Sequence, residues 1–138
     1  MQSNNIPIYK EEDFKKMRAA GSLAAQILDQ LYDLIKPGIS TLEINNFCHD
    51  LIIKNNASPA PLNYKGFPKS VCTSVNHVVC HGIPNAKKIL NKGDIINVDV
   101  TVILDGWYGD SSRMFVAGKP NKKHLDLLTA TYECLQIG

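Results

Sequence analysis

Several features that would assign a chain to a broad class are missing from this sequence. No apolar run approaches the ~20 residues that a membrane-spanning helix needs, and the first residues lack the basic and then apolar pattern of a secretory signal peptide. No run of lysine and arginine occurs and the net charge is only +2, so nothing favours nucleic-acid binding. The four cysteines are scattered and form no CxxC pair, which disfavours a structural zinc cluster and predicts free thiols in a reducing cytoplasm.

What is present is typical of one globular domain. A chain of 138 residues can form a single domain with a substantial core, but hardly two. Hydrophobic residues make up 44% of the chain and charged residues 20%, which is ordinary for a soluble globular protein. Composition therefore gives the size and class of the domain, and its function has to be inferred from particular motifs.

The clearest pattern is a β-hairpin, predicted over residues 95–117. Its first arm is rich in β-branched residues, which favour strands. The dipeptide Asp105-Gly106 suits a two-residue type I′ turn, because both central residues of that turn need positive φ. With this turn, Leu104 faces Trp107, and the pairing of the two arms is fixed from there.

The same register brings two carboxylates together. Asp110 falls opposite Thr101, and Asp99 lies two residues before Thr101 on the same face. The Cα atoms of the two aspartates are then roughly 7–8 Å apart as diagonal neighbours. Two carboxylates so close in a mostly buried sheet repel each other, and one would tend to take up a proton. Because a divalent cation between them removes this conflict, the pattern indicates a metal site.

Three helices are predicted around this hairpin. The first covers residues 11–36, where Gly21 weakens it locally and would permit close packing. The second covers residues 40–56 and begins with a Ser-Thr-Leu-Glu capping box. The third covers residues 120–138. Its periodic apolar side chains are expected to form a buried side, namely Leu125, Leu128, Tyr132 and Leu135.

The segment between the helices and the hairpin is less regular. Residues 57–69 form a loop by composition, yet they carry Tyr64 and Phe67, which either line a binding pocket or cover the core. Residues 70–73 and 77–80 resemble two short strands.

Histidines near these strands have two interpretations. His81 follows the second strand, where Gly82 would free the backbone and Pro84 would fix it, so that the imidazole can point into a cleft. A histidine in this setting is more often structural than catalytic, and His77 has the same standing. The order of the elements, with a strand pair and a hairpin between helices, indicates an α+β fold with antiparallel pairing.

Three stretches of the sequence carry a family resemblance. Residues 63–84 (NYKGFPKSVCTSVNHVVCHGIP), 93–102 (GDIINVDVTV) and 105–115 (DGWYGDSSRMF) closely resemble the type I methionine aminopeptidases, and the likeness extends from MRAAG at 17–21 to the third helix. The resemblance implies a pita-bread (creatinase/aminopeptidase) fold, in which two similar halves, each with helices packed on one face of an antiparallel sheet, close over a two-metal site. It implies a cytoplasmic metalloaminopeptidase that removes the N-terminal methionine from nascent polypeptides as they leave the ribosome.

The resemblance also implies roles for particular residues. Asp99 and Asp110 match the two metal-ligand aspartates of the first half, for two divalent ions per complete site (Co, Mn, Fe, Zn or Ni). His81 matches the catalytic histidine that contacts the substrate. The positions lining the pocket for the methionine side chain, whose thioether packs well against aromatic edges, match Tyr64, Phe67 and Cys72.

The likeness is incomplete in one respect. The second half of the family's domain supplies a histidine and two glutamates as ligands and another glutamate as proton shuttle, and we find no counterpart of these in the sequence. Two carboxylates do not complete the coordination shell of a hydrolytic metal. Residues 1–138 are therefore expected to be the amino-terminal half of a catalytic domain, with the second half absent and no activity alone.

Two other functions are compatible with the same fold. A related pita-bread enzyme, an Xaa-Pro aminopeptidase or prolidase, would share the aspartate pair, but the stretch 64–84 argues against it. A non-catalytic binding protein would have no need of a buried carboxylate pair, so the presence of His81, Asp99 and Asp110 together counts against that function.

Overall fold

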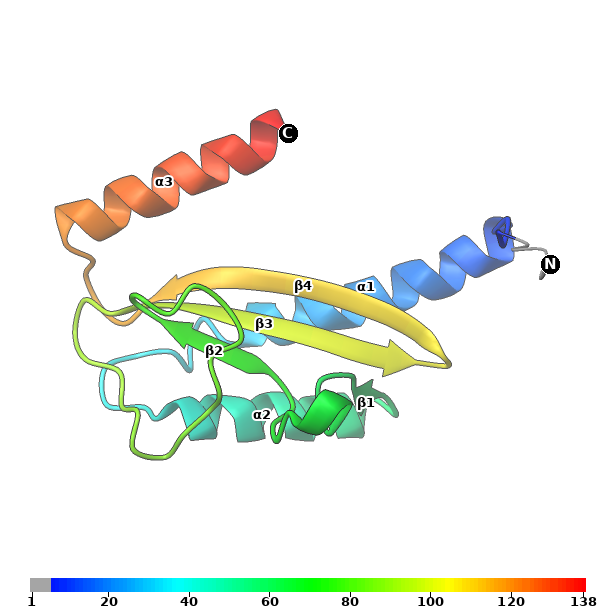
Figure 1. Ribbon diagram of the computed structural model, residues 1–138, viewed down its shortest axis with the longest axis horizontal. Helices are drawn as coiled ribbons and strands as arrows, with labels where there is room; N and C mark the ends of the chain where they lie inside the picture. The colour runs from blue at the N-terminus through cyan, green and yellow to red at the C-terminus, as the bar shows by residue number, and fades with distance from the viewer. Residues whose placement is uncertain (1–5) are drawn as a thin grey trace.

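A four-stranded antiparallel sheet lies at the centre of the protein in the computed structural model, which describes residues 6–138. Strand β3 is its middle strand. It pairs along its whole length with β4 on one side, and with β1 and β2 at separate stretches of the other side (Figure 1). The elements in chain order are α1 (Glu11–Gln30), α2 (Thr41–Lys54), β1 (Ser58–Pro59), the 3-10 helix η1 (Tyr64–Gly66), β2 (Cys72–Val75), β3 (Ile95–Leu104), β4 (Trp107–Val116) and α3 (Lys122–Ile137).

The hairpin of β3 and β4 has the register predicted from its turn. Leu104 pairs with Trp107, and Thr101 pairs with Asp110. Asp105 and Gly106 have φ values of 49° and 81°, so both turn residues adopt the positive φ that a type I′ turn requires. A two-residue turn of this type permits only one register between the two strands. The predicted assignment of side chains to the two faces of the hairpin is therefore confirmed.

The two faces of the sheet differ in burial. On one face, α1 packs against β3 and β4, and α2 lies along β1 and β2. The β3 side chains on this face are fully buried: Ile96, Val98, Val100 and Val102. Each contributes roughly 1.5–3 kcal/mol through removal of apolar area from water. The opposite face carries Asn97, Asp99, Thr101 and Ile103, which are only partly buried, and it forms the open side of the molecule (Figure 1).

Helix α1 is shorter than predicted: it ends at Gln30 rather than at residue 36. The N–H of Leu31 bonds to the carbonyl oxygen of Leu28 at 3.2 Å, which tightens the last turn, and the chain continues as turns. Leu31 and Ile35 remain buried in the core. The apolar periodicity therefore continues past the helix, because it reflects burial of side chains rather than backbone geometry.

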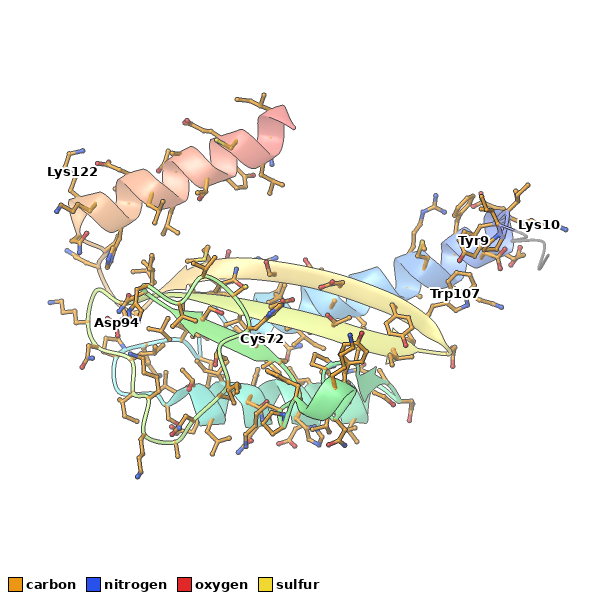
Figure 2. All side chains as sticks on the ribbon, viewed as in Figure 1. Tyr9, Lys10, Cys72, Asp94, Trp107 and Lys122 are labelled. Carbon is orange, nitrogen blue, oxygen red and sulfur yellow. The ribbon has the colours of Figure 1, made fainter. Side chains whose placement is uncertain are left out.

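Contacts at both ends of α1 attach it to the hairpin. Tyr9, just before the helix, packs edge-to-face on Trp107 with ring centroids 5.5 Å apart (Figure 2). Arg113 of β4 donates to Asp29 at 2.7 Å, and its guanidinium lies 5.3 Å from the ring centroid of Tyr32. These contacts fix the helix lengthwise against the back of the hairpin.

Helix α2 begins with the predicted capping box. Ser40 Oγ accepts from the N–H of Glu43 at 3.2 Å, and the Glu43 carboxylate accepts from the N–H of Ser40 at 2.8 Å. Ser40 Oγ also donates to the Glu43 carboxylate at 2.6 Å, and this bond, together with the one from the Ser40 N–H, lowers the pKa of Glu43. Later in the helix, His49 Nδ1 lies 2.8 Å from Ser70 Oγ, which gives this histidine a structural partner.

The prediction of a second short strand over residues 77–80 is wrong. Asn76 has φ 54° and ends β2, and its side chain donates to Asp94 at 2.9 Å. The following residues form an exposed turn, in which Val79 is 91% exposed. The chain then returns to β2 at Gly82 instead of adding a strand.

The burial predicted for helix α3 is also wrong. Leu125, Tyr132 and Leu135 are exposed, and Leu128 is only partly buried. Figure 1 shows α3 standing away from the sheet. It is held near its start, where His124 Nδ1 lies 2.9 Å from the carbonyl oxygen of Gly93. Its apolar stripe has no partner surface within residues 6–138. No helix in the same residues is long and apolar enough to cross a membrane.

Candidate metallopeptidase site

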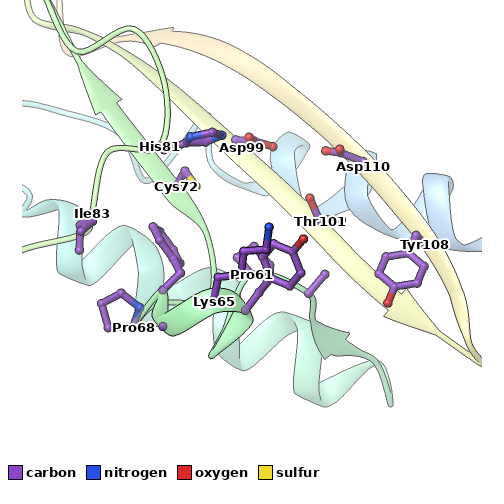
Figure 3. Close-up of a pocket in the computed structure, with 14 residues that line it drawn as sticks. Pro61, Lys65, Pro68, Cys72, His81, Ile83, Asp99, Thr101, Tyr108 and Asp110 are labelled. Carbon is purple, nitrogen blue, oxygen red and sulfur yellow. The ribbon is translucent and has the colours of Figure 1, made fainter.

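A cleft of about 800 Å³ lies on the open face of the sheet. Figure 3 shows its three walls, which come from β3 and β4, from the loop around η1, and from β2 with the turn that follows it. All six residues that the sequence singled out line this cleft: Tyr64, Phe67, Cys72, His81, Asp99 and Asp110. Residues up to 46 positions apart in the sequence therefore meet in one cavity.

The carboxylates of Asp99 and Asp110 lie close to each other on the strand wall (Figure 3). Burial raises the pKa of Asp99, and the neighbouring carboxyl of Asp110 raises it further, while His81 partly offsets both effects. The two carboxyls are neighbours, as expected from the hairpin register, but the pair is less buried than predicted, because Asp99 is only partly buried and Asp110 is exposed.

His81 reaches the same cleft because the backbone after β2 folds tightly against that strand. The carbonyl oxygen of Gly82 accepts from the N–H of Thr73 at 2.8 Å, and the N–H of Gly82 donates to Ser74 Oγ at 3.1 Å. A Cβ atom on Gly82 would lie 2.1 Å from the carbonyl oxygen of Thr73, so only glycine permits this approach. His81 itself adopts φ 56°, and its ring lies beside Asp99 (Figure 3).

Cys72 enters the cleft from β2, where it pairs directly with Asp99 of β3. Facing residues on paired strands point to the same side of a sheet, which places the thiol next to the carboxylates. Burial raises the pKa of Cys72 to about 11, with smaller contributions from the negative charge of Asp99, then Cys80 and Asp110. The thiol is therefore neutral near pH 7 and acts as an apolar wall.

We expect alkylation to distinguish the four cysteines. Cys80 and Cys134 are exposed, whereas burial raises the pKa of Cys48 to about 12. At about pH 8 only about one Cys72 thiol in a thousand is ionised, given its pKa of about 11. Timed treatment with iodoacetamide, followed by mass spectrometry of the peptides, should show Cys80 and Cys134 modified first. Equal rates at all four thiols would contradict this order.

Tyr64 and Phe67 come from the loop that the sequence left with two interpretations. Both line the cleft, and Tyr64 is 65% exposed, so it does not cover the core. Both side chains therefore line a cleft rather than the core. His77, in contrast, lies in the exposed turn after β2 and is not among the residues that line the cleft.

Comparison with known proteins assigns the chain to a family. Residues 15–138 match the model of metallopeptidase family M24. The chain belongs to this family. Among its relatives, the methionine aminopeptidases of Rickettsia prowazekii and Escherichia coli are 59% and 50% identical over 133 residues, which is 96% of this chain. The chain spans about half the length of these relatives, 51% and 50% respectively.

Solved structures of other peptidases share the fold of this chain. The crystal structure of methionine aminopeptidase from Rickettsia prowazekii superposes with a TM-score of 0.92 over 95% of this chain and 52% of that protein. The enzyme from Thermotoga maritima gives a TM-score of 0.90 at 30% identity, over 95% of this chain and 53% of that one. An Xaa-Pro dipeptidase from Bacillus anthracis, 19% identical, gives 0.71 and shares the fold alone. The predicted α+β class and half pita-bread fold are confirmed.

Membership of a metallopeptidase family implies dependence on a divalent metal ion, and the strand wall of the cleft fits such an ion. Carboxylate oxygens are hard donors that divalent cations accept. The pKa of Asp99 is raised by burial and by Asp110, and a cation between the two groups would relieve that repulsion. Within residues 6–138, however, no three His, Cys, Asp or Glu side chains gather closely enough to hold an ion by themselves.

The cleft of this M24 chain also contains residues that the motifs did not single out. Four of them are Lys65, Ile83, Thr101 and Tyr108. Thr101 and Tyr108 each lie two positions from a cleft aspartate on the same strand, so the period of the strand could have identified them. Lys65 and Ile83 lie in irregular segments, where no periodicity indicates the direction of a side chain.

Proposed function

We propose that this chain is the amino-terminal half of the catalytic domain of a methionine aminopeptidase, which hydrolyses the first peptide bond of chains that begin with methionine. One observation carries the proposal: Asp99, Asp110 and His81 share a single cleft with an aromatic and thiol-lined wall. The relatives named methionine aminopeptidase, at up to 59% identity, support it. Nascent polypeptides leaving the ribosome in the cytoplasm are the proposed substrates.

Asp99 and Asp110 are the proposed metal ligands. Both side chains line one cavity, and Asp99 is partly buried, which strengthens its interaction with a cation. When bound, two divalent ions (Co, Mn, Fe, Zn or Ni) would polarise the scissile carbonyl and activate water near neutral pH. Together the aspartates offer too few donors for a complete shell, so further ligands would come from the half of the domain that the relatives have and residues 1–138 do not cover. The chain alone is therefore expected to be inactive.

His81 is the proposed catalytic histidine. Its ring lies beside the carboxylate wall and is exposed to the cavity, within reach of a bound peptide. From there its N–H can donate a hydrogen bond to the substrate as negative charge develops, or pass a proton to the leaving amine. The close contact of Gly82 with β2 fixes the backbone that carries the ring.

The wall formed by Tyr64, Phe67 and Cys72 is the proposed pocket for the methionine side chain. Two aromatic rings offer edges to a thioether, which gains from sulfur–aromatic contact. The raised pKa of Cys72 keeps its thiol uncharged, so the thiol itself adds no ionised group that would have to be desolvated beside the methionine side chain.

Peptide cleavage tests this function. With the complete catalytic domain and Mn²⁺, we expect release of methionine from Met-Ala-Ser with a kcat/KM at least about tenfold above that for Ala-Pro peptides, because burial of a methionine side chain contributes roughly 1.5–3 kcal/mol. Preference for Ala-Pro would instead favour an Xaa-Pro aminopeptidase. Binding of both peptides without cleavage of either would favour a non-catalytic binding protein.

A further inference from the structure

One cationic side chain lies in the cleft opposite the carboxylates. Lys65 belongs to η1, on the loop wall, and Figure 3 shows its side chain rising from that wall toward the strands. Its ammonium nitrogen lies 5.5 Å from the ring centroid of Tyr64. Within the part of the chain that the structure describes, Lys65 takes part in no ion pair. Its charge is therefore available to a ligand.

The backbone beneath Lys65 is a tight and well-bonded turn. Three residues adopt positive φ, namely Asn63 at 67°, Lys65 at 48° and Gly66 at 84°. The N–H of Asn63 bonds to the carbonyl of Phe67 at 2.8 Å, and the N–H of Phe67 bonds back to the carbonyl of Tyr64 at 2.9 Å. A non-glycine residue is held in the left-handed region only where its surroundings impose it, and such positions often serve ligands. The turn therefore holds Lys65 in a defined place beside the proposed methionine pocket.

The geometry of an extended peptide links this pocket to Lys65. Successive side chains of an extended chain alternate in direction, so those of residues 1 and 3 point to the same side, roughly 7 Å apart. If the first side chain enters the pocket of Tyr64, Phe67 and Cys72, the third points to the same loop wall. Among the described residues that line that wall, Lys65 carries the positive charge, and it is next in sequence to Tyr64.

We propose that Lys65 is a specificity-determining residue, which makes the cleft favour peptides with an acidic side chain at their third residue over peptides with a basic one. This inference rests on the proposed aminopeptidase function. An acidic third side chain would meet the ammonium group of Lys65, whereas a lysine there would be repelled by it. The ammonium is exposed, so the effect is modest and sensitive to salt.

The test uses the complete catalytic domain with Mn²⁺ and three C-terminally amidated peptides, Met-Ala-Asp-Leu, Met-Ala-Ser-Leu and Met-Ala-Lys-Leu. We expect kcat/KM to fall in that order, with about a threefold difference per charge at low salt and near equality at about 0.5 M NaCl. Lys65→Glu should reverse the order. Lys87→Glu makes the same change of charge on an exposed turn that does not line the cleft, and it should leave the order unchanged.

A second measurement separates this proposal from the proposed function. Calorimetry of the same peptides, after removal of the metal with a chelator, reports binding without turnover, and it should show the same order and the same reversal in Lys65→Glu. Absence of methionine release from every peptide would contradict the aminopeptidase function, and binding would then decide on Lys65. Release or binding that is equal for the three peptides, or an order that Lys65→Glu does not change, would overturn the role of Lys65.

Discussion

Replacing Asp99 with Asn should weaken the binding of Mn²⁺ or Co²⁺ to the complete catalytic domain roughly 100-fold or more. Loss of a residue that only hydrogen-bonds to a metal ligand already lowers metal affinity about 10–100-fold, and loss of a ligand should cost at least as much. The substitution keeps the size of the side chain and removes its charge, along with one of its two carboxylate oxygens. The cleft then retains one proposed carboxylate ligand from this chain, Asp110. Calorimetric titration with either metal measures the change, and methionine release from Met-Ala-Ser should fall with metal occupancy.

The matched control for this substitution is Asp105→Asn. Asp105 belongs to the same hairpin, and its replacement changes the net charge by the same amount. It lies in the turn, however, and does not line the cleft. Asparagine tolerates the left-handed conformation that Asp105 adopts at φ 49°. Metal affinity should therefore stay unchanged in Asp105→Asn. Affinity that is equally unchanged in Asp99→Asn would remove Asp99 from the set of metal ligands.

Replacing Gly109 with Ala should destabilise the fold by about 3 kcal/mol, the upper part of the range for overpacking a core. Gly109 lies on the helix-facing side of β4, where the backbone of α1 passes directly over it. A Cβ atom there would lie 2.1 Å from the carbonyl oxygen of Ala20 and 2.6 Å from the N atom of Gly21. Both are backbone atoms, so neither can turn aside, and the helix would have to move off the sheet. Urea denaturation followed by circular dichroism measures the loss.

A substitution at Gly21, on the helix side of this contact, should change the stability of the protein in the opposite direction. Gly21 lies inside α1, and a Cβ atom on it would meet nothing within 4 Å. Gly21→Ala should therefore stabilise the protein by about 0.5–1 kcal/mol, the difference between glycine and alanine within a helix. The close packing expected near Gly21 is real, but the missing side chain that permits it is that of Gly109. Equal destabilisation by both substitutions would contradict this assignment.

Local patterns in the sequence were sufficient for the hairpin and its carboxylates. The Asp105-Gly106 turn leaves one register for the two arms, and a strand alternates its faces with a period of two, so the common face of Asp99 and Asp110 follows from residues only eleven positions apart. The capping box at Ser40 was equally predictable, because both of its hydrogen bonds join residues three positions apart.

Other features required contacts between distant segments. The position of His81 depends on the close approach of Gly82 to β2, and residues 77–80, which resemble a strand, form an exposed turn because the chain returns to β2 beyond them. The apolar stripe of α3 has the period of a buried helix, but burial needs a second surface, and none lies against it within the described residues.

Turn chemistry and the period of the side chains within short stretches were enough to predict the α+β class, the register of the hairpin and the pair of aspartates on its open face. Two features became known only from the folded chain: the loop around η1 faces the carboxylates rather than covering the core, and Lys65 stands opposite them and forms no ion pair within residues 6–138. A loop has no period from which the direction of its side chains can be inferred. Its course depends on packing against segments that are distant in the sequence and become its neighbours when the chain folds.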